Sequence, residues 1–134
     1  MFKQPWKYLF LWLLPLVVSA NYVHWLGDYN TALHLASKKH KPLLVLVVKK
    51  TCKQCNTVIK NQFMNQSYIE KINQKTVSVI VTYEGTENYP IELYYTSIFP
   101  TLFIVESKKE VFLRDPLYGK EINTNILSGI INGL

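Results

Sequence analysis

The 134-residue chain has only two cysteines, Cys52 and Cys55, which lie three positions apart in a lysine-rich stretch. A disulfide between them would close a very small loop, and such a loop removes little entropy from the unfolded chain. The spacing therefore favours thiol–disulfide chemistry over a structural cross-link. An inert disulfide and a pair of buried thiols remain alternatives.

We expect a helix to begin at or near Cys52. The unpaired N–H groups and the positive end of the helix dipole favour a thiolate there. Lys49, Lys50 and Lys53 add positive charge, and both effects lower the pKa of the Cys52 thiol. Cys55, one helical turn further on, can close a disulfide with Cys52 or resolve a mixed disulfide. We therefore predict that Cys52 is the exposed, attacking thiol and Cys55 the more buried, resolving one.

Metal and haem sites fit the pair poorly. A closed zinc site takes four ligands, and the chain has no second cysteine pair. The three histidines, which would have to complete a Cys2His2 site, all precede the pair: His24, His34 and His40. That order would be unusual. Covalent haem attachment is excluded because Asn56 stands where a histidine is needed. We expect no metal and no cofactor beyond a redox-active Cys52–Cys55 disulfide.

A proline marks a second site in the segment "SIFPTLFIV". Pro100 immediately precedes an apolar strand, where a proline can cost a ladder hydrogen bond. A cis peptide bond in a tight turn explains its position better. An ordinary trans proline at the start of a strand is the alternative.

The first twenty residues have the organisation of a secretory signal peptide. Lys3 and Lys7 precede an apolar run, Tyr8–Val18, and small residues follow up to Ala20. The run is about 11 residues, whereas a membrane helix needs roughly 20. We predict a signal peptide over residues 1–20 that is cleaved after Ala20, and one exported domain over residues 21–134 in the periplasm or another extracytoplasmic space. An uncleaved anchor is the alternative.

The charge of the chain is moderately basic. Fifteen Lys and Arg residues stand against nine Asp and Glu residues, a formal net charge of +6. Removing Lys3 and Lys7 leaves thirteen against nine, or +4. The lysines are scattered and no nucleic-acid-binding motif accompanies them, so we expect no nucleic-acid partner. Contact with a membrane would come only through an uncleaved signal segment, and we expect a monomer.

The remaining elements surround the two sites. Helical periodicity covers the segment from Asp28 to Pro42, and Asp28 or Asn30 can cap this helix. The continuous apolar run Leu43–Val48 is typical of a strand buried on both faces. The further expected helices are one from the cysteine pair to about 64, a short one at 67–74 capped by Asn65 or Ser67, a short one at 91–97, and one at 120–133. In the last of these, Ile122, Ile126, Leu127 and Ile130 repeat at helical spacing. The further expected strands are at 76–83, 101–106 and 110–114. This order predicts an α/β fold, a central mixed β-sheet flanked by helices on both faces.

Two segments resemble the thioredoxin superfamily: "LLVLVVKKTCKQC", a buried strand followed by the cysteine pair, and "IFPTLFIV", a proline before an apolar strand. The element order is similar over residues 28–133. The opening "DYNTALHLASKKHKPLLVLV" resembles secreted thioredoxin-like domains, including the one that terminates the bacterial transmembrane disulfide reductase. The resemblance implies a thioredoxin-like fold and a thiol–disulfide oxidoreductase. In such folds the loop that corresponds to Phe99, Pro100 and Thr101 packs against the cysteines and binds an extended substrate segment by strand-like hydrogen bonds.

The chain departs from the family pattern at the site. Thr51 replaces a common tryptophan, Lys53-Gln54 replaces the usual dipeptides, and Leu46 replaces a buried acid. Glu84, Glu92 or water would then have to accept the proton of Cys55. These differences favour a specialised redox partner protein over general activity, with protein thiols and disulfides as substrates. The resemblance favours a reductase over an oxidase.

A non-catalytic module that binds partners through the proline groove is the rival function. The segment "NYPIELYYTSIF" supplies four aromatic residues for an apolar landing surface: Tyr89, Tyr94, Tyr95 and Phe99. Half-buried packing of these rings is the plainer interpretation. Replacing Cys52 with serine separates the two functions, because only an oxidoreductase needs the thiol.

Overall fold

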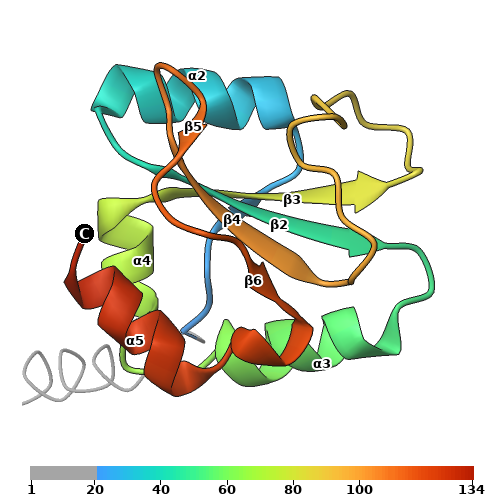
Figure 1. Cartoon of the computed structure of the whole chain (residues 1–134). Helices are drawn as coiled ribbons and strands as arrows, with labels where there is room; N and C mark the ends of the chain where they lie inside the picture. Colours follow the sequence, from blue (N-terminus) through green and yellow to red (C-terminus); the bar gives the residue numbers. More distant parts are fainter. Residues whose placement is uncertain (1–20) are drawn as a thin grey trace, which may run out of the picture.

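A six-stranded mixed sheet forms the centre of the protein (Figure 1). The computed structural model describes residues 21–134, so the predicted signal peptide lies outside the described residues. The strands are β1 (Trp25–Leu26), β2 (Leu43–Lys49), β3 (Val77–Tyr83), β4 (Thr101–Glu106), β5 (Val111–Phe112) and β6 (Leu117–Tyr118). Their order is β1-β3-β2-β4-β5, and β6 also pairs with β4. The pairs β1–β3 and β2–β3 are parallel, and every pair that involves β4 is antiparallel.

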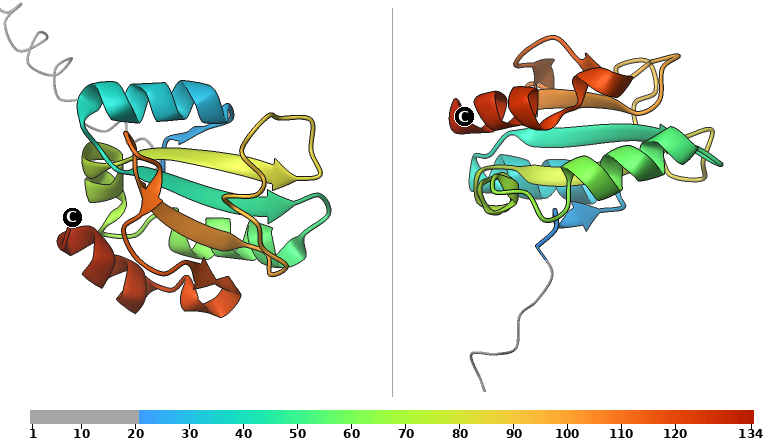
Figure 2. Two further views of the ribbon diagram at one scale, coloured as in Figure 1. Left: turned by 45° about the horizontal axis from the view of Figure 1, so that its top comes forward. Right: turned by 90° about the horizontal axis from the view of Figure 1, so that it is seen from below.

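Helices cover both faces of this sheet, as the sequence predicts. They are α2 (Tyr29–Lys39), α3 (Lys53–Gln62), α4 (Ile69–Lys75) and α5 (Thr124–Asn132), with a 3₁₀ turn, η2 (Gly119–Glu121). The views in Figures 1 and 2 place α2 against one face and α3, α4 and α5 against the other. No helix within residues 21–134 has the length and apolar character needed to cross a membrane.

Strand β2 is apolar on both sides because both of its faces are covered. Leu44 and Leu46 pack with residues of α3, α4 and α5, whereas Leu43, Val45 and Val47 pack with α2. All five are completely buried. Burial of each such side chain contributes about 1.5–3 kcal/mol. The strand is therefore held firmly between the two cores, and this fixes the position of its ends.

Helix caps follow the sequence prediction for α2 and differ for α4. Asp28 caps α2 by accepting a hydrogen bond from Thr31 N (2.8 Å), and its hydrogen bonds to the Thr31 side chain and backbone lower the pKa of its carboxyl group. The prediction that Asn65 or Ser67 caps the next helix is wrong. That helix begins after Tyr68, which makes no side-chain cap hydrogen bond.

The segment from residue 84 to residue 100 contains no helix, although the sequence predicts one at 91–97. Leu93 N and Tyr94 N both donate to the Pro90 carbonyl (3.1 and 3.2 Å), which makes a single turn. The Tyr94 ring is buried against Phe103, with ring centroids 5.1 Å apart. We attribute the difference to this anchor, since burying Tyr94 fixes the backbone in a turn instead of a continuous helix.

The last helix is shorter than predicted. It begins at Thr124, and Asn123 caps it by accepting a hydrogen bond from Ile126 N (3.0 Å). Leu127 and Ile131 are its buried residues, whereas Ile126 is exposed. Ile130 is partly buried against the core and Ile122 is buried just before the helix, so Ile126 is the one exposed residue of the four predicted at helical spacing.

Candidate active site

Antiparallel pairing of β2 and β4 brings the cysteine segment and the proline segment to one edge of the sheet. Val47 in β2 pairs with Thr101 in β4, so the end of β2 lies beside the beginning of β4. Cys52 follows the end of β2 by three residues, and Pro100 directly precedes β4. The two segments that the sequence singles out thus meet at the right-hand edge in Figure 1.

Cys52 and Cys55 form a disulfide, with an S–S distance of 2.09 Å. Cys52 is the N-cap residue of α3 and is partly exposed, whereas Cys55 lies within the first turn and is only 2% exposed. The backbone N–H of Cys55 donates to Cys52 Sγ at 3.0 Å. Cys52, the more exposed of the two cysteines, thus has its sulfur at the N-terminus of α3. This position stabilises negative charge on the sulfur.

The Phe99–Pro100 peptide bond is cis, the geometry expected from the sequence. Pro100 is buried, and its carbonyl accepts a hydrogen bond from Gly119 N (2.9 Å). Thr101 is also buried, and its hydroxyl donates to the Ile98 carbonyl and is hydrogen-bonded with Thr96 Oγ1 (2.9 Å). The Thr101 side chain thus holds the proline loop in place and does not reach the surface.

Phe99 connects the proline loop to the end of β2. Its ring is partly buried and packs against Tyr83, with centroids 5.4 Å apart. Lys49 Nζ lies over the same ring, 5.4 Å from its centroid, a cation–π geometry. Lys50 and Lys53 are exposed beside Cys52. Lys49 therefore lies at the proline loop, and the other two lysines lie at the cysteines.

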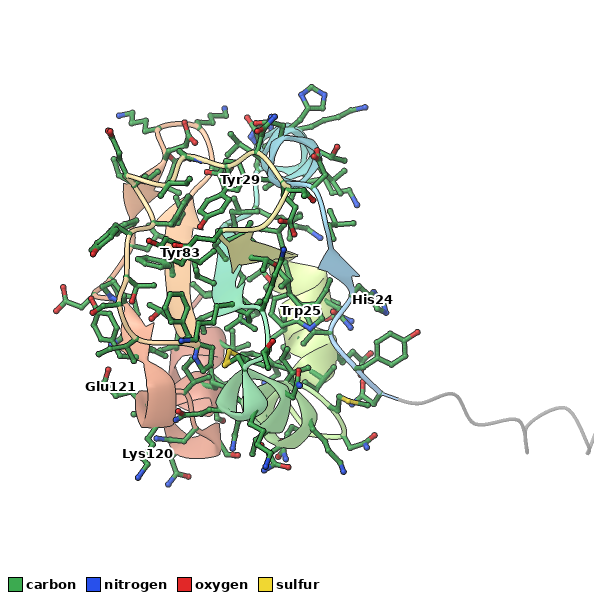
Figure 3. All side chains as sticks on the ribbon, turned by 90° about the vertical axis from the view of Figure 1, so that its right-hand side faces the viewer. His24, Trp25, Tyr29, Tyr83, Lys120 and Glu121 are labelled. Carbon is green, nitrogen blue, oxygen red and sulfur yellow. A yellow bond between two sulfur atoms is a disulfide. The ribbon has the colours of Figure 1, made fainter. Side chains whose placement is uncertain are left out.

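A third loop, which the sequence analysis missed, packs beside these two. Gly119 has a φ of +52°, and a Cβ built there would lie 3.6 Å from Gln54 Nε2 and 3.7 Å from Ile98 Cγ2. Gln54 lies between the cysteines in the chain, so Gly119 lies beside a side chain of the cysteine segment. Figure 3 faces this edge, with Tyr83 on one side of the disulfide and Lys120 and Glu121 on the other. No local pattern around Gly119 points to this contact.

With this geometry in place, the comparisons with known proteins identify the family. The Thioredox_DsbH family model, described as "Protein of unknown function, DUF255", matches residues 13–102. The chain belongs to this thioredoxin-like family. No curated protein matches the chain.

Solved structures similar to this protein share the thioredoxin-like fold. A putative disulphide-isomerase from Bacteroides thetaiotaomicron is 21% identical, with 87% of this chain and 96% of that chain covered and a TM-score of 0.69. A DsbH oxidoreductase is 14% identical (88% and 90% covered, TM-score 0.66), and a thioredoxin from Thermus thermophilus is 15% identical (83% and 85%, 0.66). Identities this low show the fold alone. The family model confirms the superfamily predicted from the sequence, and the solved structures confirm the fold.

Leu46 occupies the position at which the family pattern has a buried acid. Leu46 is completely buried in the apolar core. Glu84 and Glu92, the acids suggested by the sequence as proton acceptors for Cys55, are both exposed. Since Cys55 is buried, a carboxylate on the exposed surface is poorly placed to take its proton directly.

The aromatic landing surface predicted at residues 89–99 was wrong in part. Tyr94 is 1% exposed and belongs to the core, where its hydroxyl is hydrogen-bonded with that of Tyr29 (2.8 Å). Tyr29 in turn donates to Glu110 Oε1 (2.8 Å). Tyr95 is exposed, whereas Tyr89 is half-buried and its hydroxyl has no hydrogen-bond partner among residues 21–134. Burial raises the pKa of Tyr89.

Within residues 21–134, no group of three or more His, Cys, Asp or Glu side chains could hold a metal ion. All three histidines are exposed on or beside the elements that precede the cysteines. We therefore base the chemistry of this site on the two cysteines.

Proposed function

We propose that this protein is an exported thiol–disulfide oxidoreductase that reduces or exchanges disulfides in protein substrates. One observation carries the proposal. Cys52 is partly exposed and its sulfur caps the helix that follows a buried strand, with the Cys55 backbone nitrogen 3.0 Å away, whereas Cys55 is buried. This geometry favours an ionised, accessible nucleophile and a protected resolving thiol.

The reaction proceeds in two exchange steps from the reduced pair. The Cys52 thiolate attacks one sulfur of a substrate disulfide, forms a mixed disulfide and releases the other substrate sulfur as a thiolate. Cys55 then loses its proton, attacks Cys52 Sγ and releases the second substrate thiolate. The substrate gains two electrons, and the pair is left as the Cys52–Cys55 disulfide. A dithiol redox partner protein must reduce the pair again, and no further cofactor takes part.

The proline loop supplies the binding site for the substrate backbone in this proposal. The Phe99 main-chain groups have no hydrogen-bond partner among residues 21–134, and Phe99 is attached to the end of β2 through Lys49. An extended substrate segment can pair with Phe99 as an added strand does. Pro100 and Thr101 act by fixing the loop, because both are buried and hydrogen-bonded.

The proposed cleavage after Ala20 is compatible with the contacts of Asn21. Asn65 N donates to the Asn21 carbonyl (2.7 Å), and Asn21 Nδ2 donates to the Gln66 carbonyl (3.1 Å). Cleavage after Ala20 would leave these bonds intact. The N-terminal sequence of the protein recovered from the extracytoplasmic fraction tests this point, and a chain that retains Met1 in the cytoplasm would contradict it.

A Cys55→Ser variant tests the proposed activity directly. Without the resolving thiol, mixed disulfides formed at Cys52 should persist, so substrates should migrate as adducts on non-reducing gels and be released by reductant. A Cys52→Ser variant is the matched control and should form none. Absence of adducts, together with a pair that resists alkylation after mild reduction, would contradict the proposal.

The same variants separate the rival function. A non-catalytic binding module would keep its partner in the Cys52→Ser variant, whereas the oxidoreductase would lose its covalent partner and its activity. Burial of Tyr94 removes one of the four rings on which the binding-module interpretation depends.

A further inference from the structure

The surface beside the disulfide combines an apolar centre with a positively charged margin. Two of the centre's three side chains, Ile98 and Tyr118, are 49% and 40% exposed, and Phe99 is partly buried against Tyr83. Their two segments adjoin because Gly119, next to Tyr118, donates to the Pro100 carbonyl and lies against Ile98. We name the docking face as Ile98, Phe99 and Tyr118 together with the three basic residues Lys49, Lys50 and Lys53.

The charge next to the cysteines in the chain is positive. Residues 49–60 contain four lysines and no Asp or Glu. Lys49, Lys50 and Lys53 are exposed, and none of them forms an ion pair with a carboxylate in the described part of the chain. The Lys49 ammonium group lies over the Phe99 ring, at the proline loop. Three positive charges are therefore carried within three residues of Cys52, one of them at the proline loop.

Acidic residues at this end of the sheet belong to other loops. Glu121 follows β6 and accepts a hydrogen bond from Tyr118 N (2.9 Å). Glu84, Glu87 and Glu92 belong to the loop between β3 and β4. The positive charge is therefore local: the three lysines of the docking face are all within three residues of Cys52 in the chain, and no acid is.

We propose that the docking face selects acidic partners: extended segments that carry Asp or Glu within a few residues of the reacting cysteine. This inference rests on the proposed function, since it names the substrate class for the same thiol pair. The apolar centre accepts the side chains next to the substrate cysteine. The lysines attract the flanking carboxylates and disfavour basic segments, because charge complementarity raises association rates and like charges lower them.

The test measures the rate at which Cys52 captures three matched peptides. Each peptide has one cysteine activated as a 2-pyridyl disulfide, and the residues on both sides of it are all Glu, all Gln or all Lys. The Cys55→Ser protein limits the reaction to one step, in which Cys52 forms a disulfide with the peptide and releases 2-thiopyridone, followed by absorbance. Reaction with 2,2′-dithiodipyridine, which carries no peptide, reports the intrinsic nucleophilicity of Cys52.

We expect the Glu peptide to react about tenfold faster than the Lys peptide at about 0.01 M salt, the low end of electrostatic rate enhancement. The ratio should approach one at about 1 M salt, where charges are screened within about 3 Å. Replacing Lys49, Lys50 and Lys53 with glutamine should abolish the preference. Lys60→Gln, an exposed change in the last turn of the same helix, should leave it intact.

The outcomes distinguish a failure of this inference from a failure of the proposed oxidoreductase function. Equal rates for the three peptides would overturn the acidic preference and leave the oxidoreductase standing. Equal slowing of all three peptides and of 2,2′-dithiodipyridine in the triple variant would also overturn it, because the lysines would then act only on the thiolate. No reaction of Cys52 with any of the reagents would overturn both.

Discussion

Reduction of the Cys52–Cys55 disulfide should destabilise the folded protein only slightly. The pair closes a loop of four residues, since the cysteines are three positions apart. Loop-closure entropy then stabilises the oxidised form by about 2 kcal/mol at 25 °C. In the reduced form, a Cys52 thiolate at the N-terminus of α3 regains about 0.3–1 kcal/mol from the helix dipole. The oxidised form should therefore be more stable by about 1 kcal/mol.

This difference also shifts the reduction potential of the pair, and the direction of electron transfer depends on that potential relative to the partner's. For a domain of this size, 1 kcal/mol corresponds to about 4 °C in Tm, which calorimetry can resolve with and without an excess of a phosphine reductant. By the thermodynamic cycle, the folded chain would make the pair about 20 mV more reducing than the same pair unfolded. A Cys52→Ser, Cys55→Ser double variant should not respond to the reductant. A reduced form that melts at the higher temperature would refute this reasoning and the preference for a reductase.

Three further outcomes follow from the core and the third loop. Tyr29→Phe should cost about 3 kcal/mol in urea unfolding, because it removes the bond to Glu110 and leaves the buried Tyr94 hydroxyl unpartnered, whereas Tyr94→Phe should cost about 1 kcal/mol; equal costs would contradict the network. Burial raises the pKa of Tyr94 to about 12 and also raises that of Tyr29. Since the unfolded chain releases these protons near pH 10, the free energy of unfolding should fall above that pH by about 1.4 kcal/mol per pH unit for each tyrosine, and a variant with both changed to Phe should lose this fall. Gly119→Ala should cost about 1–2 kcal/mol from its positive φ alone, as the nearest atoms leave room for a methyl group; a loss above about 4 kcal/mol would show a clash that the structure lacks.

Much of the fold could be predicted from the sequence because the long elements carry their own patterns. The run Leu43–Val48 predicts β2, since six successive apolar residues need cover on both faces, and the structure confirms this burial for the first five. Strands β1 and β6 have two residues each, too few to show a period. At Tyr94, contacts with Phe103 and Tyr29 override the local helical pattern, and no local signal reveals them.

The candidate site, like the fold, could be predicted only in part from the sequence. The cysteines could be placed at a helix start because the strand, the pair and the helix are contiguous in the chain. The family resemblance implied that the loop around Pro100 packs near the pair, and the structure brings it there through the pairing of β2 with β4. The contacts of Gly119 with Gln54 and Ile98 depend on how β6 pairs with β4. Such a long-range contact leaves no trace in the residues around it.

The ionisation of Cys52 is the property on which the proposed chemistry depends. In the Cys55→Ser variant, the rate of alkylation by iodoacetamide as a function of pH reports this single thiol. We expect half of the maximal rate at or below about pH 7.5, within the range of cysteines at helix N-termini. A midpoint at about pH 8.5 or above, as for an ordinary thiol, or no alkylation of the native protein, would contradict the account.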